Sequence, residues 1–287
     1  MGEAIADTKQ EKQVVHYSSK QKILLVGEGN FSFASCLAKG FGSAKNMVAT
    51  SLDSRESVLA KYSNAAPRNL TELEDMGCVI LHEVDVHTMR RHPLLLDQLF
   101  DRIVFNFPHA GFIFPHGFIL WKPRRARSIL TNFEPSLEIT TKFLLSESTF
   151  GKSKSTTKQA LKQDFTLLEV LPENCNTSNH VFFVFSRLHQ DLVRTFFNSA
   201  CEMLKGSGEV HVTHKTSHPF SKWERVKLAE EVGLYLVEEA SFSRGDYPGY
   251  LNKRGSGKKC NRTFPIGLCS TYKFAKLPLL EFSQTTL

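Results

Sequence analysis

The chain has 287 residues, of which 41% are hydrophobic and 23% charged, enough for one large α/β domain or two small ones. No apolar run approaches the roughly 20 residues that span a bilayer. Residues 1–14 lack the apolar core of a secretory signal, so we expect an intracellular protein without a lipid anchor. The formal net charge of +7 favours polyanionic partners. Six scattered cysteines without a Cys-x-x-Cys pair predict free thiols, not a disulfide scaffold or a zinc site.

The first predicted strand and helix flank a glycine turn. The apolar run at 22–26 is rich in branched residues and stops at Gly27-Glu-Gly-Asn30, as a buried parallel strand entering a tight turn does. Helix formers follow at 31–39 and end at Gly40, a candidate C-cap. Downstream, the pattern predicts strands at 46–52, 78–82, 100–106, 209–215, 235–239 and 269–274, and helices at 54–62, 188–205 and 221–232.

Strands and helices alternate along most of the chain, which predicts an α/β fold with a mostly parallel, doubly wound sheet and helices on both faces. The last two predicted strands have no helix between them. We expect them to form an antiparallel C-terminal hairpin across the loop at 242–267, as in the methyltransferase variant of the Rossmann-like sheet. The predicted parts are a polar leader at 1–18, a Rossmann-like domain at 19–275 and a tail at 276–287.

Residues 117–187 differ in character from the rest of the chain. A basic run at 121–127 precedes Ser/Thr/Lys-rich and turn-rich stretches without sustained periodicity. The segment is also far longer than a crossover between strands requires. We therefore predict an atypical insertion, a candidate for disorder, that interrupts the domain. It is either a genuine RNA-binding insertion or untranslated genomic sequence retained in a gene model, and its composition favours the second.

The glycine turn is a candidate cofactor site. Gly27 and Gly29 would let the backbone approach a ligand closely, and the following helix would present free N–H groups to it. Ser32 stands where the dinucleotide fingerprint has its third glycine. The alternative is a tight turn without a ligand.

Three acidic residues strengthen the cofactor interpretation. Glu28 lies within the turn, and Asp53 and Asp85 each follow a predicted strand, so all three are expected at the carboxyl ends that line the ligand crevice of an open α/β sheet. Asp53 would accept the hydroxyls of a ribose, and Asp85 would meet an adenine amino group. Both NAD and S-adenosylmethionine fit this pattern. In the alternative interpretation, Asp53 merely caps the helix that follows it.

A motif at the end of the strand at 100–106 separates the two cofactors. Asn106-Phe-Pro-His109 resembles the Asn-Pro-Pro-Tyr motifs of amino-group methyltransferases, in which the Asn side chain and a proline-fixed carbonyl hold a planar N–H while a ring stacks on the base. Nicotinamide dehydrogenases have no need of such a motif. The alternative is an ordinary strand-to-loop turn with a partly buried histidine.

The motifs together resemble one family. In chain order they are Gly-Glu-Gly-Asn-Phe-Ser-Phe33, Ala-Thr-Ser-Leu-Asp-Ser54, Asn-Phe-Pro-His109, Pro-Phe-Ser-Lys-Trp223 and Tyr-Pro-Gly-Tyr250. With these motifs in the expected order, residues 16–113 and 187–275 resemble the Rossmann-like domain of the eukaryotic 25S ribosomal RNA uridine-N3 methyltransferases and their plant relatives. The resemblance implies a class I methyltransferase that uses S-adenosylmethionine. By position, it implies a cofactor site made of Gly27, Glu28, Gly29, Asn30, Phe31, Asp53 and Asp85, and catalytic residues Asn106, Pro108 and His109.

The long loop before the last strand is a candidate for contact with RNA. Tyr247 and Tyr250 stand near cations, and such pairs suit base stacking and phosphate contact, although a solvated loop is the alternative. Trp223 could line the same region or could anchor its own helix. The predicted RNA-binding residues are Lys215, Trp223, Tyr247, Tyr250, Lys253 and Arg254.

The leading hypothesis is methyl transfer to N3 of a uridine in large-subunit ribosomal RNA, in which the protein positions the acceptor and helps to remove its proton. Asn106 would orient the uracil edge and His109 would handle the proton. The alternatives are a catalytically silent RNA-binding or adaptor protein of the same fold and, less favoured, a nicotinamide-dependent oxidoreductase. The implied partners are ribosomal RNA or a pre-ribosome, with no metal and no membrane, and the implied compartment is the nucleus, the nucleolus or the cytoplasm.

Overall fold

The computed structural model describes residues 10–110, 177–218 and 220–277, with side chains of the helix that begins at 177 described from residue 186 onward. The chain divides into one unit of residues 1–111 and 188–287 and a second unit of residues 112–187. The sheet and the candidate site belong to the first unit.

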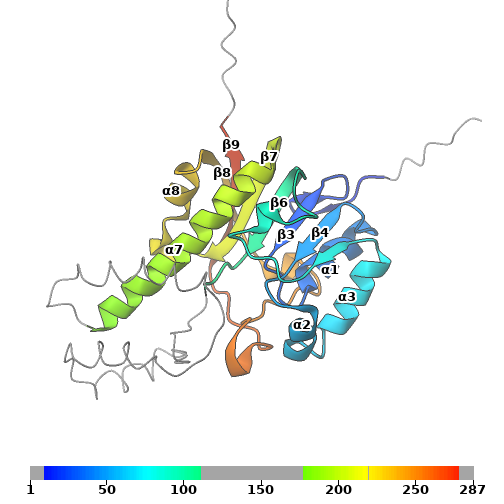
Figure 1. Cartoon of the computed structure of the whole chain (residues 1–287), viewed down its shortest axis with the longest axis horizontal. Helices are drawn as coiled ribbons and strands as arrows, with labels where there is room; N and C mark the ends of the chain where they lie inside the picture. Colours follow the sequence, from blue (N-terminus) through cyan, green and yellow to red (C-terminus); the bar gives the residue numbers. More distant parts are fainter. Residues whose placement is uncertain (1–9, 111–176, 219, 278–287) are drawn as a thin grey trace, which may run out of the picture. The chain divides into compact units, whose positions relative to one another are not determined.

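A seven-stranded sheet forms the centre of this unit (Figure 1). Its strands are β3 (Ile23–Val26), β4 (Met47–Thr50), β5 (Val79–Leu81), β6 (Phe100–Asn106), β7 (Leu204–Lys215), β8 (Leu234–Ser241) and β9 (Cys269–Lys276). They lie in the order β5-β4-β3-β6-β7-β9-β8, and β9 runs antiparallel to both of its neighbours. This is the strand order of the class I methyltransferases, and it confirms the predicted fold class, including the antiparallel hairpin.

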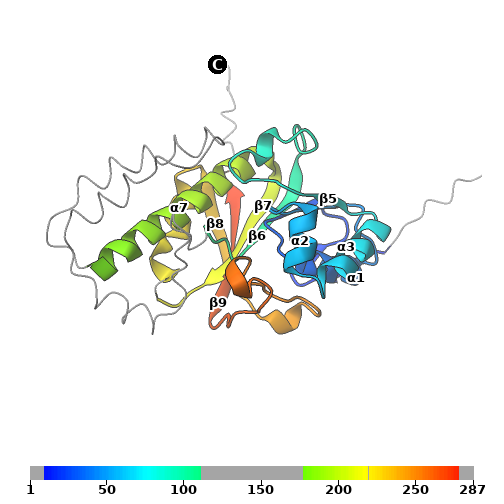
Figure 2. The same ribbon diagram turned by 60° about the horizontal axis from the view of Figure 1, so that its bottom comes forward.

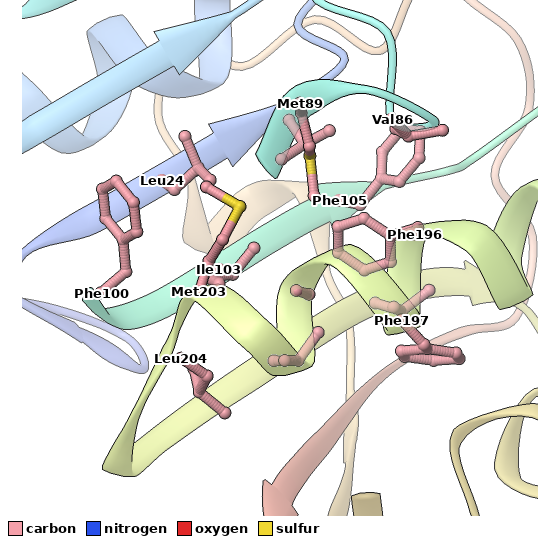
Figure 3. Close-up of a cluster of buried hydrophobic side chains, with 14 of the residues drawn as sticks. Leu24, Val86, Met89, Phe100, Ile103, Phe105, Phe196, Phe197, Met203 and Leu204 are labelled. Carbon is pink, nitrogen blue, oxygen red and sulfur yellow. The ribbon is translucent and has the colours of Figure 1, made fainter. Parts of the chain in front are cut away.

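Helices cover both faces of the sheet. The cluster of buried side chains on one face joins α1 (Ser32–Phe41), α2 (Arg55–Lys61) and α3 (Ala66–Asp75) to the sheet. The cluster on the other face joins α7 (Thr177–Met203) and α8 (Arg225–Glu230) to it, and Figure 3 shows the part of this cluster around Phe105, Phe196 and Phe197. Four 3-10 turns complete the described elements: η1 (Met89–Arg91), η2 (Phe220–Trp223), η3 (Arg244–Asp246) and η4 (Gly257–Lys259).

Strand β3 lies at the centre and explains why its sequence is apolar throughout. Leu24 and Val26 point into the cluster with α7, whereas Ile23 and Leu25 point into the cluster with α1. None of the four is more than 2% exposed. A parallel strand that is covered on both faces has no polar positions to alternate with, so the run is continuous.

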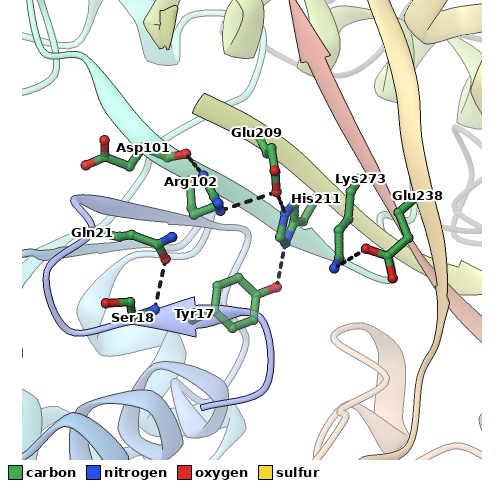
Figure 4. Close-up of polar contacts among 9 residues, drawn as sticks. All are labelled: Tyr17, Ser18, Gln21, Asp101, Arg102, Glu209, His211, Glu238 and Lys273. Carbon is green, nitrogen blue, oxygen red and sulfur yellow. Dashed lines mark hydrogen bonds and ion pairs between the residues drawn. The ribbon is translucent and has the colours of Figure 1, made fainter. Parts of the chain in front are cut away.

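Within the predicted polar leader, residues 13–18 form a small hairpin of β1 (Gln13–Val14) and β2 (Tyr17–Ser18). Tyr17 is 2% exposed, and its hydroxyl lies 3.2 Å from Nδ1 of the buried His211, as Figure 4 shows. Nε2 of His211 lies 2.9 Å from Glu209, whose lowered pKa makes it an ionised acceptor. The Nε2–H of His211 therefore donates to Glu209, and Nδ1 accepts from Tyr17. This buried contact joins the hairpin to the sheet.

Three further details differ from the sequence prediction. Helix α1 does not stop at Gly40 but continues to a left-handed cap at Gly42, whose N–H donates to the carbonyl oxygens of Ala38 and Lys39. Gly40 is required for another reason, because a Cβ there would collide with Val14 of the hairpin. The predicted helix at 221–232 is divided into η2 and α8 by Glu224, which has a positive φ of 47°. Helix α3 was not predicted.

Candidate functional site

The predicted cofactor and target residues come together at one edge of the sheet. Strands β5, β4, β3 and β6 are adjacent and parallel, so their carboxyl ends lie side by side. The turn at 27–31 follows β3, Asp53 follows β4, Asp85 follows β5, and Asn106 ends β6. In open α/β sheets this is the edge at which ligands bind.

Gly27 is fixed by packing against the core. Its φ is +69°, and a Cβ would lie 2.5 Å from the ring of Phe105. The ring belongs to the cluster beneath α7, so a side chain at this position would disturb the core as well as any ligand. Gly29 is different, because a Cβ there would lie 3.2 Å from the hydroxyl of Tyr62.

Glu28 turns toward the helix that follows it. Its carboxylate accepts hydrogen bonds from the backbone N–H groups of Phe33 and Ala34, in the first turn of α1, with a distance of 3.4 Å to Ala34. Burial raises its pKa to about 7, against the opposing effect of these two bonds. The amino end of α1, where a dinucleotide would place its pyrophosphate, thus already holds a carboxylate of the protein. This arrangement disfavours NAD.

Asn30 and Phe31 complete the turn. Asn30 is 3% exposed and its Oδ1 accepts from the N–H of Ser32 at 3.2 Å, but its buried Nδ2 has no partner in the described part of the chain. Phe31 has a positive φ of 59° and is fully buried, with its ring edge toward His82. Asn30 therefore presents a donor that is not used within the turn, whereas Phe31 is a packing residue.

The two aspartates at the strand ends each have a basic or aromatic neighbour. Asp53 accepts from the ammonium of Lys61 at 2.5 Å, through one carboxylate oxygen. It does not cap α2, since the N-cap is Ser54, whose hydroxyl accepts from Ser57. Asp85 lies 2.6 Å from Nδ1 of His87, and its side chain is half exposed. A role of Asp53 as a simple helix cap is therefore wrong.

The end of β6 carries an amide without partners. Both Oδ1 and Nδ2 of Asn106 are buried, and neither has a hydrogen-bond partner among the described residues. The backbone beyond it is fixed: the N–H of Phe107 donates to the carbonyl oxygen of Thr213 at 2.8 Å, Phe107 has a positive φ of 52°, and Pro108 is buried. The motif thus fixes the backbone from which the Asn106 amide projects at the edge of the sheet.

A row of aromatic and imidazole rings lies beyond Asn106. The rings of His109 and His189 meet edge to face with centroids 4.3 Å apart, and His189 lies 4.1 Å from Trp223. Trp223 in turn lies 4.6 Å from His214. Desolvation and the nearby His189 lower the pKa of His109, so its imidazole is neutral at neutral pH. Sequence reasoning missed His189, since a histidine within an amphipathic helix gives no signal of its own.

Two residues predicted to contact RNA, Tyr247 and Trp223, are packed inside the protein. Tyr247 is 2% exposed and its ring stacks on Phe242 with centroids 5.4 Å apart. Trp223 is 4% exposed within the ring row described above. Tyr250 is partly buried, and the centroid of its ring lies 5.2 Å from that of Phe33. The rings of Tyr247 and Tyr250 anchor the loop between β8 and β9, which we call the β8–β9 loop (242–268).

The β8–β9 loop is attached to the glycine turn. Figure 2 shows the loop in orange at the edge of the sheet where β9 begins. The hydroxyl of Ser32 accepts from the N–H of Leu251 at 3.0 Å and donates to the Leu251 carbonyl at 3.3 Å. Cβ of Lys253 lies 3.8 Å from where a Cβ of Gly29 would be, and its ammonium donates to the carbonyl oxygen of Asn261 at 2.8 Å. Lys253 is therefore turned back into the loop.

The outer part of this loop is strongly basic. Its cations are Arg244, Lys253, Arg254, Lys258, Lys259 and Arg262, against the single acidic residue Asp246. Lys258, Lys259 and Arg262 are exposed, and within the described ranges none of them forms an ion pair. Lys215 lies nearby and donates to the carbonyl oxygen of Pro265 at 2.6 Å. Of the predicted cations, Lys215 and Lys253 thus have partners inside the protein.

No cluster of three or more His, Cys, Asp or Glu side chains suited to a metal occurs within residues 10–110, 177–218 and 220–277. None of the helices in these ranges has the length and hydropathy of a membrane span. Cys36, Cys78, Cys201, Cys260 and Cys269 are free thiols, and Cys175 lies outside the described residues.

A family model described as rRNA (uridine-N3-)-methyltransferase BTM5-like matches residues 24–162 and 174–254. The chain belongs to this BMT5-like family. The resemblance proposed from the motifs is confirmed, and family and fold together identify a methyltransferase that depends on S-adenosylmethionine. The matched range runs through 117–162, within the segment predicted as an atypical insertion. That segment lies largely outside the described residues, and its boundaries stay a prediction.

The chain is also similar to individual proteins. The chain is 41% identical over 267 residues to "Uncharacterized protein At4g26485" of Arabidopsis thaliana, covering 93% of this chain and 98% of that one. It is 38% identical to "Heavy metal-associated isoprenylated plant protein 41" of the same organism, but spans only 40% of it. It is 23% identical to the 25S rRNA (uridine(2634)-N(3))-methyltransferase of Saccharomyces cerevisiae, over 86% of this chain and 70% of that one. The solved structure of the glycopeptide N-methyltransferase MtfA has a TM-score of 0.41, 12% identity, and covers 90% of this chain and 87% of that one, a likeness too low to add to the topology.

Proposed function

We propose that this protein transfers a methyl group from S-adenosylmethionine to N3 of a uridine in large-subunit ribosomal RNA. The observation that carries the proposal is the Asn106 amide, which is buried and without a partner in the described residues. It lies beside the strand that leads into the glycine turn. Buried amides that lack partners are rare in proteins, and one at a ligand-binding edge is expected to meet a ligand. The family description and the yeast relative support uridine as that ligand.

The glycine turn fits the cofactor. Gly29 and Asn30 would lie against its methionine part, Asp53 would accept from its ribose hydroxyls through the carboxylate oxygen that Lys61 does not use, and Asp85 would accept from its adenine amino group. When bound, S-adenosylmethionine supplies a methyl group attached to a positively charged sulfur. Gly27 and Glu28 would shape the turn, because a Cβ on Gly27 would face Phe105 and the Glu28 carboxylate accepts from the first turn of α1.

Asn106 and His109 would act on the base. Loss of the N3 proton would leave a negative charge that spreads onto the uracil oxygens. Formation of the bond from N3 to the methyl carbon, with cleavage of the bond from sulfur to that carbon, would then neutralise this charge. The Asn106 NH₂ group can donate to one of these oxygens, and such a donor stabilises the transition state more than the ground state. His109, whose imidazole is neutral, would handle the N3 proton. Pro108 fixes the backbone between them.

The basic part of the β8–β9 loop would hold the RNA backbone. Exposed cations that no acidic residue neutralises attract phosphates. Lys258, Lys259 and Arg262 meet this description, and Arg254 lies in the same loop. Tyr247 and Trp223 would contribute by holding the loop and the ring row in place. The implied partner is ribosomal RNA or a pre-ribosome, in the nucleus, the nucleolus or the cytoplasm.

A catalytically silent RNA-binding or adaptor protein of the same fold is the second candidate, and the basic loop is compatible with it. The decisive experiment measures cofactor affinity by calorimetry and methyl transfer to a large-subunit ribosomal RNA transcript. We expect Asn106→Ala to bind cofactor within about twofold of the parent and to transfer methyl groups about a hundredfold more slowly. Asn46→Ala, which removes an amide at the opposite end of β4, is the matched control and should leave both unchanged.

Three results would count against the proposal. A parent protein that binds cofactor and RNA but transfers no methyl group would be an adaptor. Modification of a base position other than uridine N3 in the product RNA would overturn the substrate. An Asn106→Ala variant as fast as the parent would remove Asn106 from the chemistry.

A further inference from the structure

Tyr62 has a buried hydroxyl that lacks a hydrogen-bond partner within the described part of the chain. The residue is the C-cap of α2, directly after Lys61, and its side chain is 0% exposed. Its hydroxyl forms no hydrogen bond to any described residue. A tyrosine at the end of a short amphipathic helix is normally a core residue, so its sequence position gave no sign of a further role. A buried phenol normally finds a hydrogen-bond partner.

The hydroxyl lies between two glycines of the site. A Cβ on Gly29 would lie 3.2 Å from it, and one on Gly255, in the β8–β9 loop, would lie 3.9 Å from it. Neither position has a side chain that could fill the space beside the oxygen. Asp53 and burial raise the pKa of Tyr62 above its ordinary value, so the phenol is protonated and can donate.

We propose that the Tyr62 hydroxyl donates a hydrogen bond to an acceptor oxygen of bound S-adenosylmethionine, in its ribose or its carboxylate. This inference rests on the proposed cofactor. It explains why the protein has a buried hydroxyl without a described partner, although such a group costs stability. It also explains why the turn has glycine at position 29, since a side chain there would displace the acceptor. Adding the ligand would satisfy the hydroxyl and would remove that cost.

The test is Tyr62→Phe, which deletes only the oxygen. We expect its dissociation constant for S-adenosylhomocysteine, measured by calorimetry on the full chain, to rise about tenfold, because one hydrogen bond to the ligand is lost. The melting temperature without ligand should stay equal or rise, because an unsatisfied polar group is removed. Tyr17→Phe is the matched control: its hydroxyl is bound to His211, so the variant should melt lower and bind the ligand like the parent.

A second titration with 5′-methylthioadenosine, which lacks the amino-acid part of the cofactor, shows whether Tyr62 donates to the ribose or to the carboxylate. A penalty on both ligands assigns it to the ribose, and a penalty on S-adenosylhomocysteine alone assigns it to the carboxylate. Equal affinity of Tyr62→Phe and the parent for both ligands would overturn the inference while leaving the proposed function intact. If the parent binds neither ligand, the proposed cofactor itself fails, and the inference fails with it.

Discussion

Glu28 shows how one residue of the glycine turn can serve the fold more than the ligand. Its pKa of about 7 in the folded protein lies above the ordinary value of 4.5, so the folded protein binds this proton more tightly than the unfolded chain does. The stability that Glu28 contributes is therefore complete below pH 4.5 and is lost as the pH rises through 7. Glutamine cannot ionise and does not show this loss.

The resulting prediction concerns Glu28→Gln. Between pH 5 and pH 8 the free energy of unfolding of the parent should fall by about 1–3 kcal/mol relative to that of the variant. Urea denaturation of both proteins at the two pH values measures this. A constant difference between them would mean that the buried carboxylate ionises as it does in the unfolded chain.

For single residues, the sequence predicts the place of a residue in the fold better than the direction in which its side chain points. Asp53, Asp85 and Asn106 were expected at strand ends, and they are there, because strand ends follow from runs of apolar residues. That Glu28 faces α1, and that Gly27 faces Phe105, depends on how the turn packs against the helix and the neighbouring strand. No local pattern contains that information.

A second prediction follows for Gly27. We expect Gly27→Ala to lower the free energy of unfolding by about 2–4 kcal/mol, because the variant needs a left-handed backbone at this residue and must displace the Phe105 ring. Gly29→Ala has no positive φ to accommodate and meets the end of the Tyr62 side chain, with Cβ of Lys253 at an ordinary contact distance of 3.8 Å, so it should unfold close to the parent and lose cofactor affinity instead. Urea denaturation and calorimetry of both variants check this contrast, which equal stabilities would contradict.

At the scale of elements, the β8–β9 loop combines an aromatic base and a basic outer part. Tyrosines near cations predicted base stacking, but the rings of Tyr247 and Tyr250 pack on Phe242 and Phe33. The sequence could not distinguish these uses, because the aromatic partners are far away along the chain and only the fold brings them together. What remains exposed is charge, so contact with RNA should depend on phosphates.

The prediction for this loop is electrostatic. Replacing Lys258, Lys259 and Arg262 together by glutamine should weaken RNA binding and should reduce the slope of log affinity against log salt by about 2, since each phosphate contact on single-stranded RNA contributes about 0.7. Cofactor affinity should not change. Fluorescence anisotropy at several salt concentrations gives the slope. Lys45→Gln, which removes an exposed cation before β4, is the control. Its slope should differ from that of the parent by no more than the contribution of one phosphate contact, about 0.7.

At the scale of the whole molecule, the sheet was predictable because every strand is either a short apolar run or an alternating one, and the crossovers follow a fixed hand. The hairpin of β1 and β2 was not, since its buried Tyr17 stands in a polar segment and its partner His211 is nearly two hundred residues away in sequence. The buried imidazole of His211 also makes stability depend on pH. Burial lowers the pKa of His211 to about 4, below the ordinary value of 6.5, even though Glu209 opposes the shift.

The last prediction concerns this buried imidazole. Between pH 4 and 6.5 the unfolded chain binds a proton at His211 that the folded protein excludes, so the stability due to this residue rises with pH over that range, by about 1.4 kcal/mol per unit. His211→Gln should therefore have a slope of unfolding free energy against pH that is lower than the parent's by this amount. Tyr17→Phe loses the hydrogen bond but keeps the imidazole, so it should be less stable at every pH with a slope close to that of the parent. Urea denaturation at half-unit intervals separates the two, and parallel curves for His211→Gln and the parent would mean that His211 is protonated within the folded protein.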